Sequence, residues 1–500
     1  MRKIPTTMAT QHPDNAGKPY WYNQSFLSTA AELEECYRCF SDLGIDEYNW
    51  DWEGKFVDEA VADRLLHRFY SYFKRHNLGK DKFLTFRIPN PRVEKQYRLA
   101  RAFMVIITSS QLSKSLGFEN PPIFETILPL TETAEEILEI KKAFRSLVGL
   151  EHKLLKMEDS IKNIEVIPLF EQVAKIADSA NILSKYIKLH EKTFGYKPEY
   201  LRPYCARSDP ALNSGLVPTI MALKIALSSY ISLEKASGVK LFPMLGTGSL
   251  PFRGGVSPDN LENAIDEYKG VSTFTIQSAF RYDYPKTVVR KCIDKLKKEL
   301  PRGKALSLNK KSIEEIKKII PLFENSYRTT VEKLSPLINK ISSQVPRRRE
   351  RMQHVGLFGY SRGVGKVTLP RAISFTAVLY SMGIPPELIG TGRGISLAKK
   401  IGLWDKVKHN YIHLKDDMIR SGYYLNKENV LSLEKDLGGK PDISEDIFQI
   451  EKELNIDLGP TKSSHLEHYN MTKKVYNRFK EKKSVSQLIA FTGLLRKSLG

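Results

Sequence analysis

Four acidic residues follow short apolar segments, at positions where strands would end. Glu171 follows VIPLF, Asp209 lies in ARSDPA, and Asp51 and Glu53 lie in WDWEGK. Carboxylate oxygens are the ligands that hard divalent ions prefer, and Mg²⁺ commonly keeps several waters while it binds a phosphorylated ligand. Helix capping or an ion pair is the ordinary role of a single carboxylate, and spacing alone favours it. We take Glu171 and Asp209 as candidate metal ligands and the other two as a second candidate pair.

His12 and Arg253 could supply the remaining chemistry. His12, in TQHPDN, stands at an expected strand end, where an imidazole can act as general acid or base near neutral pH. A hydrogen-bonded structural histidine is the alternative. Arg253 lies in GTGSLPFRGG, whose glycines open the backbone to an anion while the guanidinium offers two parallel donors. A plain glycine-rich turn would have the same composition.

A second glycine-rich segment, GYSRGVGKVTLPRA, resembles a nucleotide-binding P-loop but departs from its pattern. Five residues, not four, separate Gly359 from Gly365, and Val367 replaces the Ser or Thr that would bind Mg²⁺. We therefore reject a nucleotide site and expect a general anion-binding loop. Its expected donors are Arg362, Lys366 and Arg371.

Strands must position these residues, and eight short apolar or β-branched segments occur before residue 286. Each ends in polar, charged or glycine residues, and most are separated by helical patterns. The segments span residues 4–15, 45–55, 82–91, 122–133, 164–173, 200–211, 240–255 and 271–285. Eight strand–helix units predict an α/β protein with a (β/α)₈ barrel, whose chemistry lies at the carboxyl ends of the strands.

Helix signals support this division of the chain. Thr133 and Glu136 fit a capping box, and Ser257 followed by Pro258 fits a helix start. From about residue 286 the pattern is helical and lysine-rich, with no further convincing strand. We predict a barrel of residues 1–285 that carries most of the active site. Residues 286–500 form a helical extension that contributes the arginine-containing glycine-rich loop and folds with the barrel as one unit.

The net charge of +21 is compatible with a nucleic-acid partner or with a site for small anions. Much of the excess lies in helical patterns such as DKLKKELPRGK, and no nucleic-acid-binding signature accompanies it. We expect mostly solvated charge and no nucleic-acid partner. The dense block RRRER at residues 347–351 could bind an anion, form an interface or begin a salt-bridged helix.

The remaining features indicate an ordinary cytoplasmic protein. We see no apolar run close to the roughly 20 residues that span a bilayer and no secretory signal, so we expect no membrane contact. Cys36 and Cys39 form the one CxxC in the sequence, and we interpret them as two partly buried thiols. The pairs His409/His413 and His465/His468 lack further ligands nearby, and we interpret them as solvated helix faces.

Seven sequence blocks, taken together, resemble the archaeal-type phosphoenolpyruvate carboxylases, the short form of this family. They occur in order over nearly the whole chain. The blocks are TTMATQHPDN, EYNWDWEGK, FLTFRIPNP, VIPLFE, CARSDPALNSGL, GTGSLPFRGG and GYSRGVGKVTLPRAISF.

The longer bacterial and plant carboxylases share a reduced version of this pattern, and the resemblance implies roles for individual residues. His12 resembles the histidine needed for carboxylation, and Glu171 and Asp209 resemble the two metal-binding carboxylates. Arg253 resembles the arginine of a glycine-rich loop that acts in catalysis. The residues that resemble substrate-binding positions are Arg87, Gln277, Arg281, Arg362 and Arg371, with Lys366 added as a candidate. The ending LLRKSLG is similar to a C-terminal segment that packs near the active site.

This chain departs from the longer enzymes at three positions. Leu212 stands where they have a lysine, and Leu245 and Thr247 stand where they have a histidine and an arginine. An identical phosphate-binding shell is therefore not expected. Lys366 or Arg393 could compensate for the lost cations.

The resemblance implies conversion of phosphoenolpyruvate and bicarbonate to oxaloacetate and phosphate, through carboxyphosphate and pyruvate enolate. It also implies a Mg²⁺ cofactor, with Mn²⁺ as the alternative ion, and a homotetramer. Another barrel enzyme acting on phosphoenolpyruvate or a 2-oxo acid would use a similar set of carboxylates and arginines. A nucleic-acid-binding protein would explain the charge more directly but not the carboxylates at strand ends.

Overall fold

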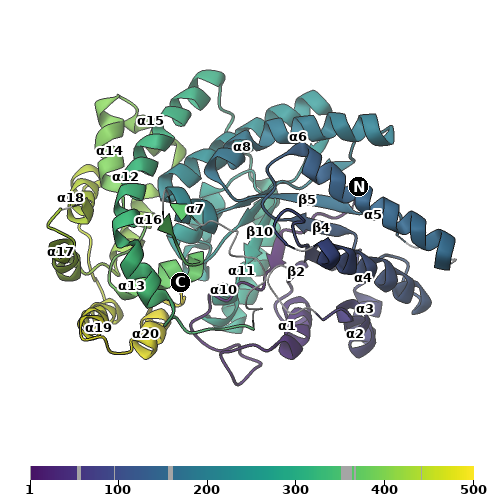
Figure 1. Ribbon diagram of the computed structural model, residues 1–500, viewed down its shortest axis with the longest axis horizontal. Coiled ribbons are helices and arrows are strands. Elements are labelled where there is room, and N and C mark those ends of the chain that lie inside the picture. The colour runs from purple at the N-terminus through teal and green to yellow at the C-terminus, as the bar shows by residue number, and fades with distance from the viewer. Residues whose placement is uncertain are drawn as a thin grey trace.

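The computed structural model describes residues 2–52, 58–94, 96–155, 161–350, 363–364, 367–440 and 442–500. Its centre is a closed barrel of parallel strands in the order β1–β10–β9–β7–β5–β4–β3–β2 (Figure 1). The strands are β1 (Thr7–Ala9), β2 (Glu47–Asp51), β3 (Phe83–Arg87), β4 (Glu125–Leu128), β5 (Glu165–Phe170), β7 (Tyr204–Ala206), β9 (Met244–Gly246) and β10 (Thr273–Ile276). Each strand falls within one predicted segment, and the (β/α)₈ barrel is confirmed.

Side chains along these strands alternate between the barrel interior and the surrounding helices. In β5, Ile167 and Leu169 belong to a small buried cluster, whereas Val166 and Phe170 belong to the large core. Glu171 continues the interior series just past the end of the strand. The same alternation gives the interior side Asp51 of β2, Arg87 of β3 and Gln277 after β10.

Helices cover the outside of the barrel, and of the two predicted start signals only the one at Thr133 makes a side-chain capping hydrogen bond. Thr133 Oγ1 accepts a hydrogen bond from Glu136 N at 3.4 Å, and Glu136 Oε2 accepts one from Glu132 N at 2.9 Å. Ser257 precedes the 3₁₀ turn η2 (Pro258–Asn260). The helices are α1 (Thr29–Ser41), α2 (Val61–Arg68), α3 (Tyr70–Arg75), α4 (Gln96–Ser115), α5 (Ala134–Leu155), α6 (Val173–Phe194), α7 (Ser208–Ser214), α8 (Leu216–Ser237), α9 (Leu261–Glu267), α10 (Ser278–Tyr282) and α11 (Lys286–Glu299). A short parallel pair, β6 (Tyr200–Leu201) and β8 (Lys240–Leu241), lies outside the barrel sheet.

Helix α8 corrects the expectation that no apolar run approaches the length of a membrane span. It has 22 residues and a mean hydropathy of 1.6, enough by length and composition to cross a bilayer. However, 78% of that apolar window is buried inside the molecule, where α8 packs against α6 and the long helix α12 (Lys310–Ser342). The helix is therefore placed as a core helix of the barrel wall.

The part beyond residue 285 is mainly helical, as predicted, and from α12 onward it gathers on one side of the barrel (Figure 1). β11 (Gly363–Val364) and β12 (Val367–Thr368) form an antiparallel pair within the glycine-rich segment, so the expectation of no further strands was wrong. Strands of two residues are too short to show an alternating pattern. The helices that follow are α13 (Ala372–Ser381), α14 (Thr391–Lys400), α15 (Trp404–Asn410), α16 (Leu414–Gly422), α17 (Lys427–Asp436), α18 (Asp442–Leu454), α19 (Ser463–Lys480) and α20 (Ser486–Arg496). The domain boundary at residue 285 stays a prediction.

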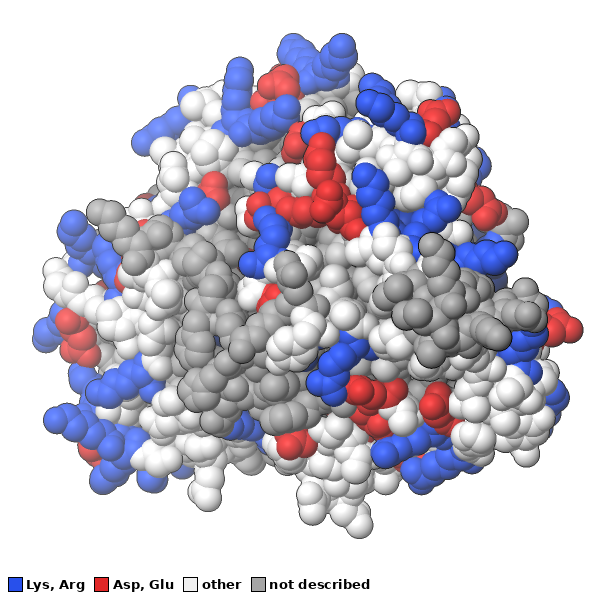
Figure 2. Space-filling view, turned by 45° about the vertical axis from the view of Figure 1, so that its right-hand side comes forward, with Lys and Arg blue, Asp and Glu red and all other residues white. Residues whose placement is uncertain are grey.

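Basic side chains are spread over the surface. On the face in Figure 2, Lys and Arg side chains alternate with acidic groups and do not form one continuous stripe. Many of them make ion pairs on helix surfaces, such as Lys399 with Glu453 and Lys427 with Glu451. This distribution matches the predicted solvated charge.

Two arginines of the basic block at residues 347–351, Arg348 and Arg349, are buried and bind the chain itself. Arg348 donates to the carbonyl oxygens of Asn15 at 3.0 Å and Ala16 at 2.9 Å. Arg349 forms ion pairs with Glu32 and Glu35 on α1. The ion pairing was expected, and the described residues 347–350 are irregular in structure.

Two interpretations of cysteine and histidine pairs need adjustment. Cys36 and Cys39 are free thiols, as expected, and fully buried on α1. His409 is exposed, in agreement with the prediction, but His465 and His468 are 7% and 0% exposed, so the solvated interpretation of that pair was wrong. They face the core side of α19, which their i, i+3 spacing alone could not reveal.

Glu35 is the centre of a buried charge cluster between α1 and the barrel. Its Oε1 accepts hydrogen bonds from Arg281 Nη2 at 2.9 Å, Arg349 Nη2 at 2.5 Å and the Tyr282 hydroxyl at 2.5 Å. Burial alone would raise the pKa of Glu35, but Arg349 and Arg281 lower it to about 2. The cluster joins α1, α10 and the segment before residue 351.

Replacing Glu35 with Gln should lower the Tm markedly at pH 7. The substitution leaves two guanidinium groups buried without that carboxylate, and breaking a buried pair costs about 3–5 kcal/mol. Because folding lowers the pKa of Glu35 from 4.5 to about 2, its carboxylate stabilises the folded state fully above pH 4.5. This contribution is lost as the pH falls towards about 2. The Tm difference from the wild type should shrink over that range in thermal unfolding measurements.

Glu34→Gln is the matched control on the same helix. Glu34 pairs with the partly exposed Arg38 and Arg68, so its loss should cost no more than about 1 kcal/mol. An equal loss of Tm in the two variants would contradict the role given to Glu35.

Candidate functional site

Glu171 and Asp209 lie at the carboxyl ends of neighbouring strands. β5 pairs with β7, Glu171 follows β5, and Asp209 is the second residue of α7, just after β7. Glu171 Oε2 accepts a hydrogen bond from Leu130 N at 2.8 Å, which holds the carboxylate at the barrel mouth. Within the described ranges, no group of three or more His, Cys, Asp and Glu side chains is placed to hold a metal. Two carboxylates and several waters suit Mg²⁺, so the donor chemistry fits this ion.

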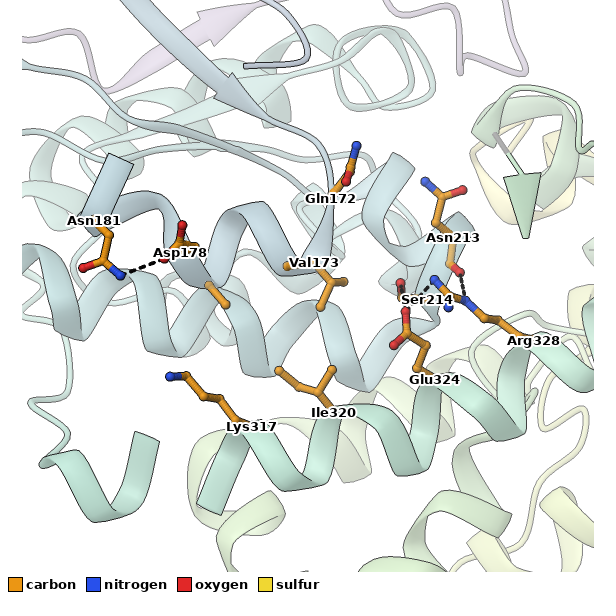
Figure 3. A pocket seen from close by; sticks show the side chains of 12 residues that line it. Gln172, Val173, Asp178, Asn181, Asn213, Ser214, Lys317, Ile320, Glu324 and Arg328 are labelled. Atoms are coloured by element: carbon orange, nitrogen blue, oxygen red, sulfur yellow. Dashed lines mark hydrogen bonds and ion pairs between the residues drawn. The ribbon is translucent and has the colours of Figure 1, made fainter. Parts of the chain in front are cut away.

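Helix α12 supports the short helix that carries Asp209. Arg328 Nε donates to Asn213 O at 3.0 Å, and Ser214 Oγ donates to Glu324 Oε1 at 2.7 Å (Figure 3). These bonds border a cavity of about 540 Å³ between α6, α7 and α12. None of the predicted site residues lines this cavity. The hydrogen bonds at its edge matter because they hold α7 against α12.

Asp51 and Arg87 form a two-bond ion pair across β2 and β3. Arg87 Nε and Nη2 donate to the two carboxylate oxygens of Asp51 at 2.7 and 2.6 Å. Gln11 Oε1 accepts a hydrogen bond from Asp51 N at 2.9 Å, which ties this pair to the end of β1. Asp51 therefore orients an arginine, in place of the metal-binding role considered for it. Its candidate partner Glu53 lies outside the described residues.

Tyr204 was not identified from the sequence, although it lies inside the barrel next to this pair. Burial raises the pKa of its phenol, Arg87 opposes the rise, and Glu171 and Asp51 reinforce it. The ring lies against Gly246, where an added Cβ would come within 3.0 Å of Tyr204 Cε2. The interior position of Tyr204 in β7 is the signal that could have revealed it.

Arg253 is buried and held by four separate parts of the chain. Nε donates to Ser208 Oγ at 3.1 Å, Nη1 donates to Asp14 Oδ2 at 3.1 Å and to Gly500 O, and Nη2 donates to Gln277 Oε1 at 2.5 Å. A guanidinium has five N–H groups, and these bonds to described residues use four of them. Burial lowers the pKa of Arg253, while Asp14 and Asp209 oppose this effect.

The glycine-rich loop makes room for this guanidinium. A Cβ added to Gly248 would lie 2.9 Å from Arg253 Cζ, closer than a side chain tolerates. Gly254 adopts φ 121° and Gly255 adopts φ 68°, conformations that favour glycine. The composition of GTGSLPFRGG thus reflects the packing of Arg253 as well as the shape of the turn.

His12 stands on a loop that α10 holds in place. Ser278 Oγ donates to His12 O at 2.6 Å and accepts hydrogen bonds from the backbone N–H groups of Asp14 and Asn15. A hydrogen bond of 3.0 Å joins His12 Nδ1 to Thr10 Oγ1 and orients the half-buried imidazole. Ser278 escaped the sequence analysis because its contacts are with residues more than 260 positions away.

Comparison with known proteins agrees with this arrangement. A family model described as phosphoenolpyruvate carboxylase matches residues 4–500. The chain is 38% identical over 507 residues to the phosphoenolpyruvate carboxylase of Leuconostoc mesenteroides, covering 100% of this chain and 99% of that one. It is 37% identical over 522 residues to that of Metallosphaera sedula, with 100% of both chains covered. The chain belongs to the phosphoenolpyruvate carboxylase family. The similar protein of Pyrococcus abyssi, 39% identical over 430 residues, covers 83% of this chain and 87% of its own.

Membership of the phosphoenolpyruvate carboxylase family confirms the resemblance, and the structure places several predicted residues together. Arg253 and Gln277 are in direct contact, and His12 and Asp14 share the loop that binds Arg253. Arg371 immediately precedes α13, and Gly500 packs against that helix at Ile373. The end of the chain thus lies beside Arg253, as the resemblance implied.

Other predicted residues of the carboxylase site lie elsewhere. Arg281 donates to the carbonyl oxygens of Thr10 and Ile276 and to Glu35, so its guanidinium is turned towards α1. Arg393 binds Asp446 through two bonds at the contact of α14 with α18 and does not replace a cation of the site. Arg362 and Lys366 lie outside the described residues.

The three residues that differ from the longer carboxylases, Leu212, Leu245 and Thr247, are all buried. Leu212 and Leu245 are both 0% exposed in the large apolar core. Thr247 exchanges hydrogen bonds with Thr275 on the neighbouring strand, from N at 2.7 Å and from Oγ1 at 2.8 Å. None of the three side chains substitutes for a phosphate ligand.

Gly248→Ala should destabilise the loop and displace Arg253. Overpacking of a filled site costs about 1–3 kcal/mol, and the nearest atom is held by four hydrogen bonds. Thermal unfolding should show a lower Tm. Gly459→Ala is the control, because no atom lies within 4 Å of a Cβ there. Equal Tm values for the two variants would contradict this account of the loop.

Proposed function

We propose that this chain catalyses the carboxylation of phosphoenolpyruvate by bicarbonate, giving oxaloacetate and phosphate. The observation that supports the proposal is that His12, Glu171, Asp209, Arg253 and Gln277 each follow the carboxyl end of a strand of one parallel barrel. Family membership supports the same reaction. The substrates are small anions, and the arginines at the strand ends suit them.

A Mg²⁺ ion, or Mn²⁺ in its place, would be held by Glu171 and Asp209. When bound, the ion neutralises phosphate charge and stabilises the oxygen of an enolate. The pairing of β5 with β7 brings the two carboxylates to adjacent positions.

Arg87 and Arg253 would position the two substrates. Asp51 fixes the guanidinium plane of Arg87, so this arginine can bind phosphate without losing side-chain freedom at the moment of binding. Bicarbonate attacks the phosphorus, which gives carboxyphosphate and pyruvate enolate. Arg253 would hold the carboxyphosphate and then CO₂ against the enolate.

His12 would accept the proton of carboxyphosphate as this intermediate breaks down. Its orientation by Thr10 and the anchoring of its loop by Ser278 suit a base that must remain in one place. Water must be excluded at this stage, because an enolate protonated early yields only pyruvate.

We also propose a cytoplasmic homotetramer, the assembly that the family resemblance implies. Exposed apolar side chains on the helical half offer surfaces that subunit contacts would cover, among them Leu431 at 61% and Phe448 at 55% exposure.

The deciding experiment couples oxaloacetate to NADH oxidation through malate dehydrogenase, with purified protein, phosphoenolpyruvate, bicarbonate and Mg²⁺. The signal should require all three small molecules. Pyruvate and phosphate without oxaloacetate would point to another enolate enzyme of the same barrel type. Absence of any turnover would overturn the proposal.

His12→Asn should separate the two halves of the reaction. Oxaloacetate formation should fall by about 10²–10⁴, the usual contribution of a general base, while bicarbonate-dependent phosphate release persists. Phosphate and oxaloacetate are measured in parallel. His409→Asn, at an exposed site, should change neither. Normal oxaloacetate formation by His12→Asn would remove His12 from the mechanism.

Glu171→Gln should raise the Mg²⁺ concentration needed for half-maximal rate, because one of two charged ligands is lost. The metal is titrated at saturating phosphoenolpyruvate and bicarbonate. Glu132→Gln, which removes a partly exposed surface ion pair with Arg92, serves as the control. An unchanged metal requirement in Glu171→Gln would contradict its assignment as a ligand.

A further inference from the structure

Tyr204 of β7 lies inside the barrel, just below its mouth. In the strand register it pairs with Leu169 of β5 and Met244 of β9. The next interior residues of these two strands are Glu171 and Gly246. The Tyr204 ring leans towards the mouth, because a Cβ added to Gly246 would lie 3.2 Å from the hydroxyl oxygen. Gly246 is partly exposed, unlike the two buried residues before it in β9, so the hydroxyl reaches the level at which the barrel opens.

The Tyr204 hydroxyl makes no hydrogen bond within the described part of the chain. The side chain is 4% exposed, and a buried phenol usually finds a partner for its O–H group. The hydroxyls of Tyr48 and Tyr200 follow this rule, with Glu35 at 2.7 Å and Glu125 at 2.6 Å. Burial raises the pKa of Tyr204, so its hydroxyl keeps its proton at neutral pH and can donate it in a hydrogen bond.

Apolar side chains form the floor around Tyr204, and charged side chains form the rim above it. The floor residues are Met8, Ile127, Ile167, Leu169, Ala206 and Met244. Beyond the effect of burial, Arg87 lowers the pKa of Tyr204, and Glu171 and Asp51 raise it, so these strand-end charges lie close to the phenol. The Tyr204 hydroxyl is thus a neutral donor between an apolar floor and a charged rim.

This position suits the carboxylate of phosphoenolpyruvate better than its phosphate. A phosphate with two negative charges needs cations, and an apolar floor with one neutral donor would make its burial costly. A carboxylate has a single charge shared by two oxygens, and a phenol can give it a short charge-assisted hydrogen bond. The proposed roles of Arg87, Arg253 and His12 concern the phosphate and bicarbonate, so they leave the substrate carboxylate unassigned.

We propose that the Tyr204 hydroxyl donates a hydrogen bond to the carboxylate of phosphoenolpyruvate and so orients the substrate with this group towards the barrel floor. The phosphate then stays at the rim, where Arg87 can bind it and bicarbonate can attack the phosphorus. Tyr204 is thereby a substrate-binding residue of the site. The inference rests on the proposed carboxylase function, and ligand binding tests it separately from turnover.

Binding is measured by isothermal titration calorimetry on the full chain with Mg²⁺, using 2-phosphoglycolate and inorganic phosphate as probes. Phosphoglycolate has a carboxylate and a phosphate but no enol, whereas inorganic phosphate lacks the carboxylate. Tyr204→Phe should weaken phosphoglycolate binding by about tenfold or more, because a hydrogen bond to a charged group is lost. Its affinity for inorganic phosphate should be unchanged. Equal weakening of both ligands, or an unchanged affinity for phosphoglycolate, would overturn the proposal.

Tyr230→Phe is the matched control, because the Tyr230 hydroxyl lies on the outward side of the same strand. It is 2.6 Å from Ser179 Oγ and 3.7 Å from Cys205 Sγ. This substitution should lower the Tm and leave phosphoglycolate binding unchanged. Tyr204→Phe should leave the Tm nearly unchanged, since it removes no hydrogen bond within the described structure. A loss of Tm as large as that of Tyr230→Phe would indicate a structural hydroxyl and overturn the proposal.

Steady-state kinetics give a second readout of the same contact. In Tyr204→Phe the KM for phosphoenolpyruvate should rise about tenfold, and the KM for bicarbonate should not change. A rise confined to the KM for bicarbonate would overturn the proposal. If the wild type binds phosphoglycolate but forms no oxaloacetate, the proposed function fails alone, and weaker phosphoglycolate binding by Tyr204→Phe would still support the carboxylate contact.

Discussion

A buried guanidinium must have its charge and its N–H groups satisfied, and the arrangement of this molecule around Arg253 follows from that requirement. The partners come from the loop after β1, the start of α7, the end of β10 and the last residue of the chain. Each lies at the carboxyl end of the barrel or is brought there by the helical half. Since an unpaired buried charge is costly, these segments are stable together and would be strained apart. The helical extension is thus part of the same charge network as the barrel.

Glu35 likewise balances the charge of buried arginines, on the other side of β1. It pairs with Arg281 and Arg349, and Arg281 also binds the carbonyl oxygens of Thr10 and Ile276. The two networks flank the loop of His12. Arg281 of the Glu35 network binds the carbonyl oxygens of Thr10 and Ile276, before this loop, and Arg253 of the other network binds Asp14, after His12. The position of the imidazole is therefore set by two buried charge clusters, neither of which contains His12 itself.

The sequence was sufficient for the barrel because each strand carries its own local signal. The expected strand end gave Glu171, whereas Gln277 came from the family resemblance, and in the structure both continue the interior series of their strands. Arg281 shows the limit of such reasoning. It lies four residues after Gln277 on the short α10, and only the distant Glu35 turns its guanidinium towards α1. Ser278 was missed for the same reason, since the residues that it contacts are far away in sequence.

The lost cations of the longer enzymes have a physical consequence for phosphate binding. Leu212 and Leu245 are buried in the apolar core, and Arg393 is engaged by Asp446 at a distant helix contact. Among the strand-end residues that the structure describes, Arg87 and Arg253 are the predicted arginines that remain at the mouth. Both are held by carboxylates, Asp51 and Asp14, so their orientation is fixed before any ligand arrives. Fewer but preorganised donors lose less entropy on binding, and a site of this kind depends strongly on whatever shifts those two side chains.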